Sequence, residues 1–230
     1  MNKKKIISIS LIILAALVAG FIYFSWDSSD GPGEYYDKDY QVNDFPDALK
    51  YSDQERAEER AEERVVELNK EYKMLNTDDG YKYEHWINIG VLKKKLGDYQ
   101  GAEEAWLKAA SINDQRSLAY GNLAFLYGYS LKDYQKCEEY YLKAIDLGAN
   151  NYSYYANLAD IYKYNLTDKK DQVESLMLSG VEKCIDKVDG DLYMYLAFYF
   201  EDEGNLAKAK DYAQKAIAKN PGLKDQLSDF

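Results

Sequence analysis

The sequence predicts an all-α protein built from stacked helical hairpins, and three observations carry this prediction. A five-residue phrase that begins with an aromatic residue recurs four times, at Trp86, Tyr120, Tyr155 and Tyr193. The intervals of 34, 35 and 38 residues are typical of repeat proteins, whose units bury their apolar faces on one another. A second apolar phrase follows each recurrence, and a long apolar run begins the chain.

Residues 1–26 are predicted to be a membrane anchor. Three lysines precede an apolar run from Ile6 to Trp26, which is long enough to cross a bilayer as a helix. The lysines favour a cytoplasmic N-terminus, with the rest of the chain on the periplasmic or extracellular face. The alternative is a signal peptide, cleaved near Ala19-Gly20, and secretion of the remainder. We favour the uncleaved anchor, because the apolar run continues beyond that point.

Two segments separate this anchor from the repeats. Residues 27–46 are rich in Gly, Pro, Asp and Tyr and are predicted to be a flexible acidic linker. Residues 47–78 are predicted to be an amphipathic helix that caps the open end of the first repeat, and a coiled coil or a partner-docking helix is the alternative. The apolar stripe of this helix consists of Ala57, Ala61, Val65, Leu68, Tyr72 and Leu75.

Residues 82–223 are predicted to hold the repeats, each as two amphipathic helices around a polar turn such as Gly97-Asp98 or Gly204-Asn205. The aromatic residue of each phrase fills the space between neighbouring helices, and a small residue four positions later lets them approach closely. These small residues are Gly90, Ala124, Ala159 and Ala197. Residues 224–230 are left as a C-terminal tail.

This pattern resembles the tetratricopeptide repeat (TPR) family. The four units begin near Tyr83, Ser117, Tyr152 and Gly190. The resemblance implies a right-handed solenoid of helical hairpins whose first helices line a concave face. The second unit has one inserted residue near Ser130 and some Sel1-like character. The third unit deviates most, because its turn at residues 165–171 is longer and lacks glycine.

Composition excludes several classes of function. The net charge of −11 is concentrated in residues 27–80, which hold 17 acidic and 7 basic side chains. Residues 27–80 form an acidic stem, which contains the predicted stem helix, and the repeats are nearly neutral. Neither part offers the basic face that nucleic-acid binding needs. The chain has no phosphate, dinucleotide or nucleophile motif, and its single histidine, His85, is interpreted as structural, so no enzyme activity, cofactor or metal is expected. Cys137 and Cys184 are predicted to be buried thiols too far apart for a disulfide.

The repeats are therefore predicted to bind a protein or peptide partner rather than a small molecule. In the TPR family the third residue of the phrase is often an asparagine that hydrogen-bonds the backbone of an extended peptide. Asn88, Asn122 and Asn157 match that position, and Tyr195 replaces it in the fourth unit. The alternative is that these asparagines only bridge neighbouring helices. The other predicted groove residues are Ile87, Val91, Lys95, Leu118, Phe125, Tyr129, Lys163, Met194 and Phe198.

The sequence thus predicts a membrane-anchored scaffold of a bacterial cell envelope. Its groove, apolar in the middle and charged at its edges, favours a partner segment with apolar side chains. Docking of that segment would support complex assembly, secretion or quality control. Two alternatives stay open: an adaptor that oligomerises through the stem helix or the convex face, and a secreted effector or immunity-type protein.

Overall fold

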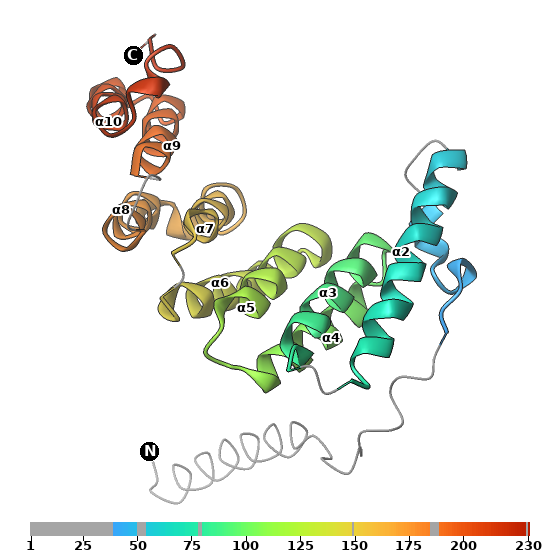
Figure 1. The fold of residues 1–230 in the computed structure, drawn as a ribbon. Coiled ribbons are helices and arrows are strands. Elements are labelled where there is room, and N and C mark those ends of the chain that lie inside the picture. The colour runs from blue at the N-terminus through green and yellow to red at the C-terminus, as the bar shows by residue number, and fades with distance from the viewer. Residues whose placement is uncertain (1–38, 50–53, 78–79, 149, 185–188, 229) are drawn as a thin grey trace, which may run out of the picture. The chain divides into compact units, whose positions relative to one another are not determined.

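The structure is a computed structural model of the chain, and it describes residues 39–49, 54–77, 80–148, 150–184, 189–228 and 230. Residues 39–230 form one compact unit, whose described part contains the nine α-helices α2 to α10 (Figure 1). The predicted anchor, residues 1–26, lies outside the described residues. Within the part that is described, no helix has both the length and the apolar character that a membrane crossing requires.

The helices pack in the order of the sequence, each against the next one along the chain. Helix α2 (Gln54–Met74) precedes the first hairpin, α3 (Lys82–Lys95) and α4 (Tyr99–Ile112). The second hairpin is α5 (Ser117–Phe125), continued by η3 (Leu126–Leu131), with α6 (Tyr134–Asp146). The third is α7 (Tyr152–Tyr164), η4 (Thr167–Gln172) and α8 (Val173–Lys183), and the fourth is α9 (Asp189–Asp202), α10 (Leu206–Lys219) and η5 (Pro221–Leu223). The predicted all-α repeat of hairpins is confirmed.

The polar turns within the hairpins cap the helices that follow them. The Asp98 carboxylate accepts a hydrogen bond from the Gly101 amide at 2.8 Å, at the start of α4. The Asn205 side chain caps α10 in the same way. Such a cap satisfies a backbone donor that has no partner within the helix. Gly97, just before Asp98, has a φ of +82°, in the left-handed region that glycine reaches without strain.

The small residues of the repeated phrase bring helices into close contact. All four are buried, and so are the aromatics Trp86 and Tyr155, whereas Tyr120 and Tyr193 are half-buried. At Gly90 an added Cβ would lie 2.4 Å from the indole Nε1 of Trp106, so no larger residue fits against that ring. The Trp106 indole N–H also donates to the Ile87 carbonyl at 3.2 Å. Helices α3 and α4 are thereby joined at their closest approach.

The second and third units keep the hairpin fold despite the inserted residue of one and the long turn of the other. The inserted residue near Ser130 is accommodated by η3, a π-helical turn that prolongs α5 and ends at Lys132, whose φ is +60°. The long turn of the third unit forms the 3-10 helix η4, and α8 starts without a side-chain cap. The third unit still buries Val173 and Met177 completely, so its second helix keeps the apolar face of the repeat.

Helix α2 lays its apolar stripe against the first hairpin. Five of the six predicted stripe residues are buried, and the side chain of the sixth, Ala57, lies outside the description. Helix α2 packs on α3, where the Glu71 carboxylate lies 2.6 Å from the His85 imidazole and accepts a hydrogen bond from the Asn88 amide at 3.1 Å. These contacts hold α2 against the first hairpin.

Of the expected linker, residues 27–38 lie outside the described residues, and residues 39–46 are described. Residues 39–46 do not run free but pack on α2, with Phe45 only 4% exposed. The Tyr40 amide donates to the Asn69 side chain at 2.9 Å, and the Asn69 amide donates back to the Tyr40 carbonyl at 2.9 Å. The Tyr40 ring lies 5.4 Å from that of Tyr72. The Tyr40 ring also lies 5.5 Å from the Phe45 ring, and these aromatic contacts pack a segment whose composition is mostly polar.

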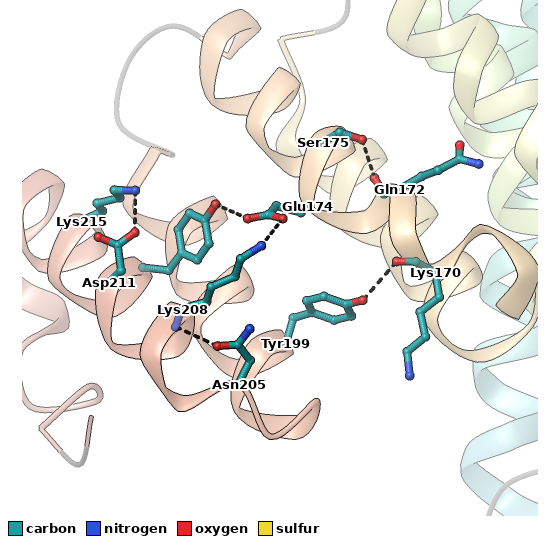
Figure 2. Close-up of polar contacts among 10 residues, drawn as sticks. Lys170, Gln172, Glu174, Ser175, Tyr199, Asn205, Lys208, Asp211 and Lys215 are labelled. Atoms are coloured by element: carbon teal, nitrogen blue, oxygen red, sulfur yellow. Dashed lines mark hydrogen bonds and ion pairs between the residues drawn. The ribbon is translucent and has the colours of Figure 1, made fainter.

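A carboxylate on α8 links the third hairpin to the fourth. Figure 2 shows Glu174 accepting hydrogen bonds from the Lys208 ammonium at 2.6 Å and the Tyr212 hydroxyl at 2.7 Å, both from α10. Nearby, the Tyr199 hydroxyl of α9 donates to the Lys170 carbonyl at 3.0 Å. Burial disfavours the ionised form of Glu174, but the two hydrogen bonds outweigh it, so the pKa of Glu174 is lowered.

This pairing predicts a pH dependence of stability. The pKa of Glu174 is lower in the folded chain than in the unfolded chain. Ionised Glu174 therefore stabilises the fold at pH values above its unfolded pKa, and this stabilisation is lost as the pH falls through its folded pKa. We expect Glu174→Gln to lower the urea midpoint at about pH 6 and to have less effect near pH 4. The same loss at both pH values would show that the charge of Glu174 does not contribute.

Two buried tyrosines predict opposite effects of removing a hydroxyl. Within the described structure, Tyr155 has a buried hydroxyl with no hydrogen-bond partner, whereas the Tyr141 hydroxyl accepts from the Asn157 amide at 3.1 Å. Tyr155→Phe removes an uncompensated polar group and is expected to leave stability unchanged or to raise it. Tyr141→Phe should lower it by about 1 kcal/mol. Thermal unfolding of both variants checks the pair, and a larger loss in Tyr155→Phe would contradict it.

Candidate functional site

A cavity of about 330 Å³ lies between the first helices of the first three hairpins, α3, α5 and α7. Half of the predicted groove residues line it: Val91, Lys95, Leu118, Asn122, Phe125 and Asn157. Rings from the second helices, Trp106 and Tyr141, also contribute to its lining. The sequence repeat therefore brings side chains that are more than 60 positions apart, from Val91 to Asn157, to one site.

Two side-chain amides give this cavity its hydrogen-bonding capacity. Asn122 is half-buried, and its amide has no hydrogen-bond partner among the described residues. Asn157 donates one N–H to the Tyr141 hydroxyl at 3.1 Å. Because an amide has two N–H donors and a carbonyl acceptor, Asn157 keeps one N–H and its oxygen for a ligand. The pair can therefore both donate to and accept from a peptide backbone.

One position of α5 on the cavity wall carries no side chain. Gly121 lines the cavity, and an added Cβ there would lie 2.4 Å from the Tyr154 ring. The sequence reading did not single out Gly121, although it stands inside the second copy of the repeated phrase. It also missed Asn151, which lines the cavity and caps α7 by accepting a hydrogen bond from the Ser153 amide at 3.1 Å.

One rim of the cavity is aromatic and basic. The Lys94 ammonium lies 4.3 Å from the centroid of the Phe125 ring, which stacks on Tyr129 at 4.5 Å. Both rings are more than a third exposed, which is unusual for side chains of this size in a packed repeat. Burial, with a smaller contribution from Lys95, lowers the pKa of Lys94. A cation and an apolar surface therefore stand side by side at this rim.

A second cavity, of about 590 Å³, lies between α7 and α9. It gathers the remaining predicted groove residues from these helices, Lys163, Met194 and Phe198. The Lys163 ammonium pairs with Asp202 at 2.6 Å. The Tyr195 hydroxyl donates to Asp160 at 2.7 Å, and burial together with this bond raises the pKa of Tyr195. Tyr195, which replaces the repeated asparagine, thus bridges α9 to α7.

Three predicted groove residues line neither cavity. Ile87 is only 7% exposed and packs in the core. Asn88 bonds Glu71 of α2, as the alternative reading of the asparagines expected. Tyr129 contributes through its stacking on Phe125.

The remaining reactive side chains are structural. His85 pairs with Glu71 between α2 and α3, and both cysteines are buried, with burial raising the pKa of Cys137 to about 12. Across the described residues, histidine, cysteine and acidic side chains do not gather in groups of three or more that suit a metal ion. The tail after α10 buries Leu227 and places the Phe230 ring 5.5 Å from that of Phe198.

Comparisons with known proteins identify repeats within the chain and a similar fold. The tetratricopeptide repeat model matches residues 83–116 and 118–151. A crystal structure of MamA is similar, with a TM-score of 0.52 and 19% identity, over 78% of this chain and 99% of that one. A second structure of MamA protein gives a TM-score of 0.47 and 18% identity, over 74% of this chain and 85% of the other. No curated protein matches the sequence. These two matched repeats supply most of the residues that line the first cavity.

Proposed function

We propose that this chain is a protein–protein interaction scaffold that docks a peptide segment of a partner in the cavity between α3, α5 and α7. The observation that carries this proposal is the pair of amides, Asn122 and Asn157, set among apolar walls in one cavity. Such a site can hydrogen-bond the backbone of a bound segment through its amides and contact the side chains of that segment through its apolar walls. The second cavity, between α7 and α9, extends the same surface.

The geometry favours a peptide over a small substrate. The first cavity is open, and its walls include the exposed side chains Leu118 and Phe125. Sites for small ligands usually enclose most of the ligand surface, whereas a segment of chain needs an accessible groove with a few fixed polar groups. The two matched tetratricopeptide repeats support a protein partner.

The cellular setting is part of the proposal. Residues 1–26 would anchor the protein as a single span, with a right-handed solenoid of four units outside the cytoplasm. A scaffold in that position would hold a partner at the envelope during complex assembly, secretion or quality control. Cleavage of residues 1–26 would instead release a soluble protein with the same groove.

An oligomeric adaptor that uses α2 or the convex face is the competing function, and the described part of α2 offers little apolar surface for it. The buried stripe of α2 already packs on α3 and on residues 39–46. Among the described side chains of α2, Val66 is the large apolar residue that stays exposed. A single exposed valine amid charged residues is a weak basis for a helix–helix interface.

Site-specific photocrosslinking in the native cell tests the proposal. A photoreactive residue replaces Leu118, which lines the first cavity, or Leu142 on α6, which does not. Position 142 is the matched control, because Leu118 and Leu142 are 43% and 44% exposed. We expect a discrete partner adduct from position 118 alone. Equal adducts from both positions, or an adduct from 142 alone, would contradict docking in this cavity.

A further inference from the structure

The two cavities carry opposite charge. The first is lined by the ammonium groups of Lys94 and Lys95 and by no carboxylate. The second is lined by three carboxylates and one ammonium, those of Asp160, Asp191, Asp202 and Lys163. Because Lys163 pairs with Asp202 at 2.6 Å, the second cavity keeps a surplus of negative charge. A bound segment would therefore meet a positive region at one end and a negative region at the other.

Helix α7 places the two cavities within reach of one segment. It contributes Tyr154 and Asn157 to the first cavity, and Asp160 and Lys163 to the second. The helix has 13 residues and is thus roughly 20 Å long, a distance that about six or seven residues of extended chain would span. A single peptide of ordinary motif length can therefore touch both cavities while its centre lies along α7.

The charged side chains of both cavities are available to a ligand. Among the described residues, neither Lys94 nor Lys95 forms an ion pair, and the lowered pKa of Lys94 reflects its burial and the neighbouring ammonium. In the second cavity, Asp191 is half-buried and has no ion pair within the same described part. A carboxylate placed beside the lysines would relieve their repulsion, and a cation beside Asp191 would restore charge balance there.

We propose that the groove selects a dipolar segment, one with an apolar centre, acidic side chains at one end and basic side chains at the other. This inference rests on the proposed function and specifies the partner of the same site. The acidic end lies against Lys94 and Lys95, and the basic end lies against Asp160 and Asp191. Segments with the same charge at both ends are rejected because one end always faces a like charge.

A displayed peptide library tests this selection directly. The peptides are about 12 residues long, enough to reach both cavities when extended, and have a randomised apolar centre. Their ends carry Asp-Asp or Lys-Lys in the four possible combinations. The probe is the full chain in a nonionic detergent at low salt. We expect the two dipolar classes to be enriched about tenfold over either same-charge class, with the preference fading at high salt.

A second experiment reverses the charge of the first cavity in the protein. The variant Lys94→Glu with Lys95→Glu should lose the dipolar preference and enrich peptides with Lys-Lys at both ends. The matched control is Lys210→Glu with Lys224→Glu, which makes the same change of net charge at exposed positions that line neither cavity. This control should select the same peptides as the unmodified chain, and circular dichroism would establish that each variant keeps its helices.

The outcomes distinguish the proposal of peptide docking from the proposal that the bound segment is dipolar. Enrichment of apolar peptides without regard to their charged ends overturns the dipolar inference and leaves peptide docking intact. Failure to enrich any class overturns both. A control variant that shifts selection as strongly as the cavity variant also overturns the inference, because the effect would then follow net charge and not the cavities.

Discussion

Replacing Trp106 with alanine is expected to destabilise the protein by about 3–5 kcal/mol, the largest effect of any single substitution considered. The indole is 1% exposed, packs against Gly90 and donates its N–H to the Ile87 carbonyl at 3.2 Å. Its removal leaves a cavity between α3 and α4 and a glycine with nothing to pack on. For a chain of this size, such a loss lowers the melting temperature by roughly 10 °C.

The Trp106→Phe variant is the control for this prediction. Phenylalanine keeps most of the buried ring and loses the hydrogen bond, so we expect a loss well below that of alanine. Thermal unfolding followed by circular dichroism measures both variants. Because repeats stabilise mainly their neighbours, hydrogen exchange should increase first in α3 and α4. A loss below about 1 kcal/mol for the alanine variant would contradict the central packing role of Trp106.

The paired substitution Asn122→Ala and Asn157→Ala is expected to weaken partner binding at least about tenfold. Each amide would lose a hydrogen bond to the bound backbone, and two such bonds of about 1 kcal/mol each account for this factor or more. Because both amides lie on the cavity wall and neither caps a helix, helical content should not change. The measurement is a calorimetric titration with the segment identified by crosslinking at position 118.

Asn88→Ala is the matched control for the asparagine pair. It removes the same side chain from the corresponding repeat position, but Asn88 bonds Glu71 and lines neither cavity. We expect its effect on binding to be small, with a minor loss of stability from the contact with α2. Equal weakening by Asn88→Ala and by the pair would show that the asparagines act through the fold and not through the cavity.

The fold was predictable because the repeat encodes it four times. The positions of aromatic and small residues predict which helices touch, and Asp98 and Asn205 in the polar turns predict where the second helices start. Even the extra residue near Ser130 is visible in the sequence, and the structure absorbs it as a π-helical turn. The packing of residues 39–46 was not predicted, because their mostly polar composition does not indicate that Tyr40 lies between Tyr72 and Phe45.

The candidate site was predictable only as a face. Repeat register assigns residues to the first helices, and nine of the twelve predicted groove residues line a cavity: Val91, Lys95, Leu118, Asn122, Phe125, Asn157, Lys163, Met194 and Phe198. Register does not reveal that α2 engages Asn88 or that Ile87 turns into the core. It also does not show that α7 divides the groove into two cavities, since that depends on how far each hairpin is rotated against the next.

The central claim, that a peptide segment docks between α3, α5 and α7, is tested most directly by nuclear magnetic resonance. The isotope-labelled chain in a detergent micelle is titrated with the crosslinked segment, and backbone amide shifts are followed. The claim predicts the largest changes at the cavity positions, among them Val91, Gly121, Asn122 and Asn157. Changes confined to α2 or to the second helices α4, α6 and α8 would contradict it.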